Sequence, residues 1–227
     1  MPKRYIILAG EDYFLVPIKA RLNPHTPGRA AYLAGMPNFF GGADSNDGTA
    51  FATLQREVDE ESAMTCVLFG YTNIAVYQGN YYAGGRLVQC DFYYSRMWTK
   101  YRPWPDQGVW AAMAADFREM CFVAKVERRH FAGIPAGGGN AALYFNAIMA
   151  AARETAPQWA RDQFQYAPDN AFMQSQTAQA LTLFVTQWLN GTLPGDIDFG
   201  DEQVKARRRP VQATRSAATP PRHFFSR

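Results

Sequence analysis

The sequence predicts an α+β fold in which helices and a mixed β-sheet form a sandwich. Two observations lead to this prediction: short apolar, β-branched runs are punctuated by Gly, Asn and Pro, and helical patterns are interspersed among them without a regular βαβ repeat. The chain has 227 residues, of which 48% are hydrophobic and 15% aromatic. This length suits one full domain with a sizeable core and some appendages, rather than two large domains.

Strands are expected near the N-terminus and again after a helix. The apolar runs that predict them are YIILA (5–9), YFLVPIKA (13–20), TCVLFGY (65–71), IAVYQ (74–78) and LVQCDFYYSRMW (87–98). Residues 49–63 predict the intervening helix, because Phe51, Leu54 and Val58 form an apolar stripe along one side of it. Thr49 is suited to cap its first turn.

The second half of the chain has more helical pattern. Residues 107–117 predict a weaker helix, and residues 119–126 fit either a strand or the start of another helix. An Ala-rich helix is expected over 140–155, after the glycines at 137–139, and a further helix over about 171–190, ending near Gly191.

Composition indicates a soluble, cytoplasmic protein. No apolar run approaches the roughly 18 residues that a membrane span needs, and the start of the chain does not resemble a secretory signal. Cys66, Cys90 and Cys121 are odd in number and lack metal-site spacing, so we expect buried, reduced thiols. The net charge of +3 hides seven basic residues in the segment 203–227, which leaves −4 for residues 1–202. That basic segment lacks apolar periodicity and is expected to be disordered.

The segment GGADSNDGTAFATLQREVDEESAM (41–64) carries six carboxylates. On a helix, Glu57, Glu60 and Glu61 converge on one face at i, i+3 and i+4, where three like charges repel. A divalent cation would remove that penalty, since carboxylate oxygens are its preferred ligands. The alternative is a solvated acidic face with no ligand.

This segment resembles the Nudix box. The pattern of that box is a glycine, five residues, a glutamate, seven residues, Arg-Glu, an aliphatic residue, any residue, two glutamates, any residue, a glycine and an aliphatic residue. Gly42 takes the place of the opening glycine, and the register is then kept by Arg56, Glu57, Val58, Glu60, Glu61 and Met64. The resemblance implies that residues 1–155 form a Nudix-type α/β/α sandwich around a mixed sheet. Residues 156–202 would then be a helical C-terminal extension, and residues 203–227 a basic tail.

Two positions depart from the box. Gly48 stands where the first glutamate belongs, and Ala63 stands where the second glycine belongs. In the family the first glutamate helps to fix the arginine or assists with metal, and Asp44 or Asp47 could replace it here, although turn formation is the commoner use of Asp in a loop. Ala63 replaces glycine at a position where a left-handed backbone is often wanted.

The resemblance also implies a reaction and its residues. Nudix hydrolases use magnesium or manganese ions to cleave a diphosphate linkage in nucleoside diphosphate derivatives. Glu57 and Glu61 would be the principal metal ligands, Glu60 a further ligand or the base that activates water, and Arg56 would orient a carboxylate. Glu119 is the candidate base on a later loop; an exposed glutamate at a strand edge is the alternative.

The substrate class is left open among dinucleoside polyphosphates, ADP-ribose or dinucleotides, and capped RNA. The loop Gly41–Gly48 would bring backbone amides of Gly41 and Gly42 close to phosphate or metal. Tyr81 and Tyr82 lie where dinucleoside polyphosphate hydrolases of the family often carry a tyrosine, although this region is rich in tyrosine and core packing is the simpler interpretation. Because Gly48 replaces a glutamate, the alternative function is a catalytically weakened nucleotide-binding or regulatory module.

Three features outside the box receive weaker predictions. The basic tail is a candidate for binding RNA phosphates or an acidic surface, with a solubilising role as the alternative. Residues 156–202 are expected to pack against the core, with a lid or a homodimer surface as alternatives. His25 and His130 have no sequence neighbours that indicate a site, so both are expected to be structural.

Overall fold

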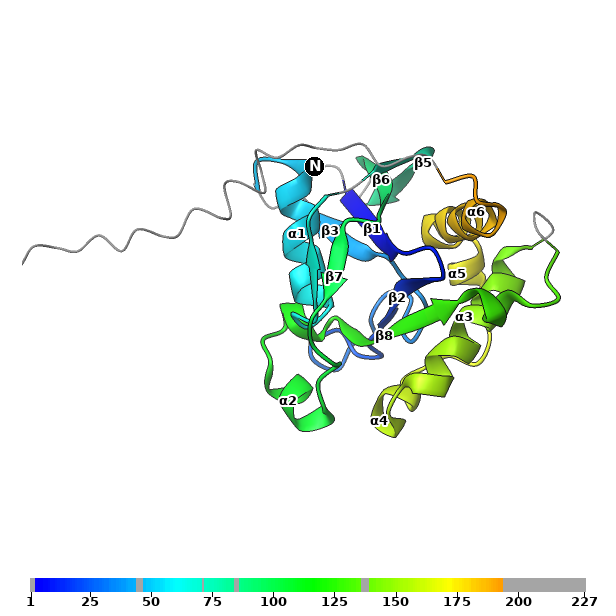
Figure 1. Cartoon of the computed structure of the whole chain (residues 1–227). Helices are drawn as coiled ribbons and strands as arrows, with labels where there is room; N and C mark the ends of the chain where they lie inside the picture. The colour runs from blue at the N-terminus through cyan, green and yellow to red at the C-terminus, as the bar shows by residue number, and fades with distance from the viewer. Residues whose placement is uncertain (1–2, 44–46, 71, 84–85, 136–138, 194–227) are drawn as a thin grey trace, which may run out of the picture.

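A mixed, six-stranded β-sheet forms the centre of the protein (Figure 1). The structure is a computed structural model that describes residues 3–43, 47–70, 72–83, 86–135 and 139–193, with the backbone alone over 72–83 and at 86 and 87. The strand order is β5-β6-β1-β2-β8, and β3 also pairs with β1. Strands β1 and β6 are parallel, whereas the other pairs are antiparallel. The predicted mixed α+β fold is confirmed.

The strands of this sheet are β1 (Lys3–Ala9), β2 (Tyr13–Lys19), β3 (Phe40–Ala43), β5 (Thr72–Ala83), β6 (Arg86–Ser95) and β8 (Met120–Glu127). A separate two-stranded ribbon consists of β4 (Cys66–Leu68) and β7 (Trp98–Lys100). The α-helices are α1 (Ala50–Glu61), α2 (Gln107–Ala112), α3 (Ala141–Thr155), α4 (Gln158–Arg161), α5 (Asn170–Met173) and α6 (Gln176–Asn190). Two short 3₁₀ helices are η1 (Asp116–Arg118) and η2 (Arg128–Phe131).

Helices cover both faces of the sheet, with α1 on one side and α3, α5 and α6 on the other (Figure 1). Alternation along β1 divides its side chains between two cores, because successive residues of a strand point to opposite faces. Ile6 and Leu8 pack in the core that includes Leu54 of α1. Ile7 packs in the larger core, which includes Phe184 of α6.

Several sequence expectations hold, and others need correction. Met120–Glu127 form strand β8, which settles the choice between strand and helix for the segment 119–126. The helix expected over 171–190 is broken into α5 and α6, because the Ser175 side chain accepts a hydrogen bond from the Ala178 amide and caps a new helix. The loop expected over Gly41–Gly48 begins instead with strand β3.

The structure describes most of the predicted C-terminal extension, 156–202, but not the predicted basic tail, 203–227. Phe172, Phe184 and Trp188 lie in the same core as the sheet, so helices α5 and α6 pack against it. The basic tail, 203–227, lies outside the described residues, and the domain boundaries stay predictions. Cys66, Cys90 and Cys121 are buried free thiols, as expected. In the described part of the chain, no helix is long and apolar enough to cross a membrane.

Candidate functional site

Helix α1 turns two of its glutamates inward. Thr49 caps the helix as predicted, since its side chain accepts a hydrogen bond from the Ala52 amide. Leu54 and Val58 are fully buried in the core. One turn apart on the neighbouring face, Glu57 and Glu61 are only 8% and 2% exposed. The acidic face of the helix is therefore largely buried rather than solvated.

The double glycine of strand β3 lies against these carboxylates. The Gly41 amide donates to Glu61 Oε2 at 2.6 Å. Gly41 has φ +148°, and a Cβ there would collide with the Arg4 carbonyl oxygen on β1. A Cβ on Gly42 would lie 2.7 Å from Glu57 Oε1. Gly41 is therefore restricted to glycine by its φ and by the neighbouring backbone, whereas a side chain at Gly42 would displace the Glu57 carboxylate.

Arg56 lies at the mouth of the site and binds three acids. Its Nη2 donates to Glu57 Oε1 at 2.8 Å and to Asp47 Oδ2 at 3.2 Å. Its Nη1 donates to Glu60 Oε2 at 2.8 Å. Burial lowers the pKa of Arg56, but the hydrogen bonds to Asp47 and the charges of Glu57 and Glu60 raise it further, so the guanidinium stays charged. Asp47 thus makes the contact with the arginine that was considered for it; Asp44 lies outside the described residues.

A second cation approaches the buried pair from strand β2. The Lys19 ammonium lies 2.7 Å from Glu119 Oε2 and 3.7 Å from Glu61 Oε1. Glu119 comes just before β8, and the pairing of β2 with β8 brings it beside Lys19, 100 positions away in the sequence. Glu119 thus lies at the same site as the box glutamates, as its predicted role requires.

Burial governs the charge of the site. It raises the pKa of Glu57 to about 7, and Arg56 offsets only part of this effect. Burial also raises the pKa of Glu61 well above its ordinary range, despite the Lys19 ammonium, and raises that of Glu60. For Glu119 burial acts in the same direction, but the charge and hydrogen bond of Lys19 together with the contact of His25 outweigh it, so the pKa is lowered. The two inner carboxylates therefore lie in an environment with too little positive charge for both to ionise easily.

His25 is a site residue that sequence reasoning missed. Its Nε2 lies 2.9 Å from Glu119 Oε1 and 3.5 Å from Asp116 Oδ1. The expectation of a structural role rested on sequence neighbours and stays a prediction, and the fold brings two acidic residues near His25. No spacing in the sequence links it to Glu119. His130 does have a local partner, since its Nδ1 accepts from the Glu127 amide at 3.0 Å.

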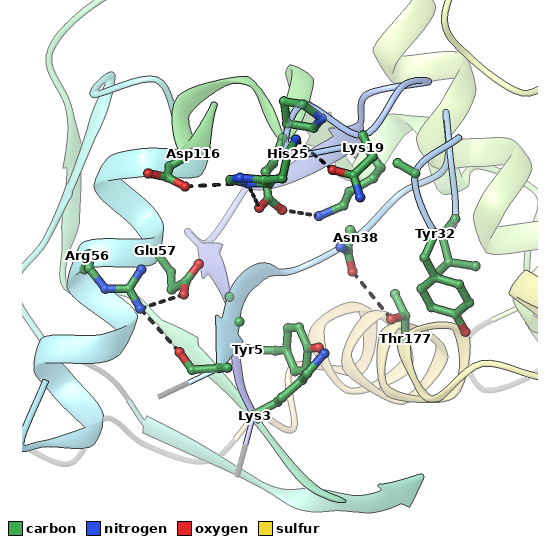
Figure 2. A pocket seen from close by; sticks show the side chains of 18 residues that line it. Lys3, Tyr5, Lys19, His25, Tyr32, Asn38, Arg56, Glu57, Asp116 and Thr177 are labelled. Atoms are coloured by element: carbon green, nitrogen blue, oxygen red, sulfur yellow. Dashed lines mark hydrogen bonds and ion pairs between the residues drawn. The ribbon is translucent and has the colours of Figure 1, made fainter. Parts of the chain in front are cut away.

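Several of these groups, though not Asp47, Glu60 or Glu61, line a pocket of about 470 Å³ whose two sides differ in chemistry. Arg56 and Glu57 lie on one side, whereas Tyr32, Asn38 and Thr177 lie on the other (Figure 2). Tyr5 and Lys3 of β1 contribute to the wall as well. The other lining residues are Lys19, Asn23, Pro24, His25, Ala31, Leu33, Gly41, Gly42, Ala43, Asp116 and Glu119.

The polar and aromatic side of the pocket is partly preorganised. The Tyr5 ring stacks on Phe92 with ring centroids 5.1 Å apart. Asn38 is 7% exposed, and its Oδ1 accepts a hydrogen bond from Thr177 of α6. Tyr32 is 71% exposed and is thus accessible to a ligand. The side chains of Tyr81 and Tyr82, predicted to bind substrate, lie outside the described part of the structure.

The carboxylates are suited to a divalent cation, although they are not gathered around one. Within the described residues, no three His, Cys, Asp or Glu side chains are placed to hold a metal ion together. Arg56 occupies Glu57 and Glu60, and Lys19 faces Glu61. However, Glu61 Oε1 is buried and accepts no hydrogen bond within the described part of the chain. An unsatisfied buried carboxylate oxygen is costly, and it is the kind of ligand that Mg²⁺ or Mn²⁺ prefers.

Comparisons with known proteins give limited information. No family model matches the chain, and no curated protein matches it either. Among solved structures, the solution structure of the E. coli ORF135 protein is similar, with a TM-score of 0.38 and 14% identity over 69% of this chain and 93% of that one. The NUDIX domain of Shewanella oneidensis NrtR, solved as a complex with ADP-ribose, is similar with a TM-score of 0.39 and 14% identity. That match covers 68% of this chain and 86% of the other. At these values neither similarity identifies a family or an activity.

Proposed function

We propose that this chain is a Nudix-type, metal-dependent hydrolase that cleaves a diphosphate linkage in a nucleoside diphosphate derivative. The observation that carries the proposal is the pair Glu57 and Glu61, buried one helical turn apart beside a pocket. Among the residues with a described placement, none donates a hydrogen bond to Glu61 Oε1. The box register from Gly42 to Met64 places those two glutamates where the family has metal ligands.

Glu57 and Glu61 would hold the cation, with Glu60 as a further ligand or base. A bound Mg²⁺ or Mn²⁺ would neutralise phosphate oxygens and lower the pKa of the attacking water. Glu119 is the candidate proton acceptor because it lies in the pocket in its ionised form: burial raises its pKa, but the contacts with Lys19 and His25 lower it further. Arg56 would fix the orientation of Glu57, since it is itself held by Asp47.

The opposite side of the pocket would bind the nucleoside. A volume of about 470 Å³ lies in the range of small-molecule sites. Tyr5 and the exposed Tyr32 offer aromatic faces for stacking, and Asn38 offers an amide for hydrogen bonds to a base. Lys3 adds a positive charge that suits a phosphate. Dinucleoside polyphosphates, ADP-ribose or other dinucleotides, and capped RNA share these chemical features.

One observation favours the second candidate, a nucleotide-binding module with weakened catalysis. Arg56 and Lys19 engage the same carboxylates that a metal would need. A protein that kept the fold and the pocket while these cations stayed in place would bind nucleotides without hydrolysing them.

A substrate panel separates the two candidates. The full chain is incubated with ADP-ribose, dinucleotides, diadenosine polyphosphates or capped RNA, in Mg²⁺ or Mn²⁺, and products are resolved by chromatography. We expect metal-dependent release of a nucleoside monophosphate or diphosphate from at least one class. Tight binding of one compound without turnover of any would instead establish the binding module.

A further inference from the structure

The Lys19 ammonium lies between the buried carboxylate of Glu61 and the partly exposed carboxylate of Glu119. It is 2.7 Å from Glu119 Oε2 and 3.7 Å from Glu61 Oε1, and the Lys19 side chain is 16% exposed. Glu61 is 2% exposed, and its Oε1 accepts no hydrogen bond from any residue that the structure describes. Lys19 thus places a positive charge beside the carboxylate oxygen that is otherwise unused.

We propose that Lys19 is a tethered cation that competes with a divalent metal ion for Glu61 and Glu119. The inference rests on the metal site of the proposed function. A lysine ammonium and a divalent ion within about 4 Å of one another repel strongly in a partly buried site. Metal therefore binds Glu61 only after the ammonium has withdrawn, and the affinity for metal is reduced by the cost of that movement.

The Lys19 side chain can move into the pocket when a metal ion binds. Lys19 lines the pocket, and its ammonium is carried on a flexible four-carbon stem. Arg56 is held differently, because its planar guanidinium is fixed at once by Asp47, Glu57 and Glu60. Loss of one of these contacts leaves it anchored by the others. Of the two cations, Lys19 is therefore the one that metal displaces.

Binding of Mn²⁺ alone tests the competition. Isothermal titration calorimetry is carried out on the full-length wild type, on Lys19→Met and on the control Lys125→Met. Lys125 pairs with Glu127 at 2.7 Å and lies over the Tyr13 ring, and it does not line the pocket. The control removes the same charge from the chain without touching the site. We expect Lys19→Met to bind Mn²⁺ about tenfold tighter or more, and Lys125→Met to match the wild type within about twofold.

Equal or weaker Mn²⁺ binding by Lys19→Met, or binding by neither protein, overturns the inference. A second measurement on the wild type does not depend on the folding of that variant. The ¹⁵Nζ resonance of Lys19, assigned by its loss in Lys19→Arg, should shift on saturation with Mg²⁺, whereas that of Lys125 should not. A Lys19 signal that stays unchanged at saturation also refutes the exchange.

These outcomes are separate from those of the substrate panel. If Lys19→Met binds Mn²⁺ more tightly and yet no compound is hydrolysed, the competition stands and the proposed activity fails. If the wild type hydrolyses a substrate while Mn²⁺ affinity is the same in both proteins, the activity stands and the competition fails.

Discussion

The Nε2 atom of His25 lies 2.9 Å from Oε1 of Glu119, although the two residues are 94 positions apart. The other oxygen of that carboxylate accepts a hydrogen bond from Lys19 at 2.7 Å. While the Lys19 ammonium is in place, both oxygens of Glu119 are therefore held, and the contact with His25 remains after metal displaces Lys19 as proposed. A carboxylate held in this way is suited to act repeatedly on a proton at one position.

Replacing Glu119 should slow the proposed reaction more than replacing His25 does. Glu119→Gln takes away the proton acceptor and should lower kcat by about 10²-fold or more. His25→Ala leaves the acceptor but frees one of its oxygens, so we expect a loss of about tenfold, with a smaller change in KM. Steady-state kinetics on the best substrate of the panel gives both values. A kcat for His25→Ala equal to that of the wild type would show that His25 does not position Glu119.

Replacing Glu61 should abolish activity without unfolding the protein. Glu61→Gln keeps the shape of the side chain but removes the charge of a principal metal ligand, so kcat should fall at least about 10³-fold. The free energy of unfolding should not decrease, because a neutral amide does not carry the cost of burying a charge, which raises the pKa of Glu61. Kinetics and urea unfolding measure the two effects.

The matched control for this change is Glu154→Gln. Glu154 is 45% exposed and pairs with Arg129 on the surface, so its loss should leave turnover unchanged. An unaffected rate in Glu61→Gln would mean that the site has been assigned to the wrong residues.

The buried Glu57 predicts how stability depends on pH in the absence of divalent metal. Its pKa is raised from 4.5 to about 7 in the folded protein, so between these values the folded state binds more protons than the unfolded state. The contribution of Glu57 to stability is therefore full below pH 4.5 and is lost as pH rises to 7, by roughly 3 kcal/mol. Glu57→Gln should remove this slope.

Urea unfolding of both proteins from pH 4.5 to 8, with EDTA present, measures the difference. The stability of Glu57→Gln relative to wild type should rise with pH across this window, and Mg²⁺ added to the wild type should oppose the loss. Parallel pH curves for the two proteins would contradict the raised pKa of Glu57.

Local sequence patterns predicted most helices and strands of the fold, but they could not predict which distant segments pair with one another. The apolar stripe at Leu54 and Val58 predicted helix α1, and Thr49 predicted its N-cap. Both signals could be read from the sequence because the residues that form them lie within a few helical turns of one another. Strand β3 was not predicted because Phe40–Ala43 is short and half glycine. Its backbone is extended because it pairs with β1. That partner is more than thirty residues away in the sequence.

The residues of the candidate site also fall into those that a local pattern predicted and those that only the fold brings together. Arg56, Glu57 and Glu61 were found because they share one helix and one spacing. Lys19 and His25 carry no local signal: Lys19 ends a strand, and His25 follows in a Pro-rich loop. Their function depends on the pairing of β2 with β8, which places Glu119 beside them. Glu119 itself could be proposed only through the family resemblance.

Gly48, which replaces the first glutamate of the box, leads to a last prediction. Its φ is +81°, in the left-handed region, and a Cβ there would meet no atom of the described residues within 4 Å. Gly48→Ala should therefore cost about 1 kcal/mol through backbone strain alone. Gly108→Ala in helix α2 is the control: Gly108 has no such φ, and alanine there should stabilise the helix by roughly 0.5–1 kcal/mol. Urea unfolding measures both changes.

Restoring the family's residue should not restore activity beyond that of the alanine variant. Gly48→Glu suffers the same strain, and Asp47 already makes two hydrogen bonds of about 3.3 Å to Arg56 Nε and one of 3.2 Å to its Nη2. Since the arginine is held, a further carboxylate has no contact left to supply, and kcat should agree within about twofold between Gly48→Glu and Gly48→Ala. A tenfold higher kcat in Gly48→Glu would show instead that the missing glutamate limits catalysis and that Asp47 does not compensate for it.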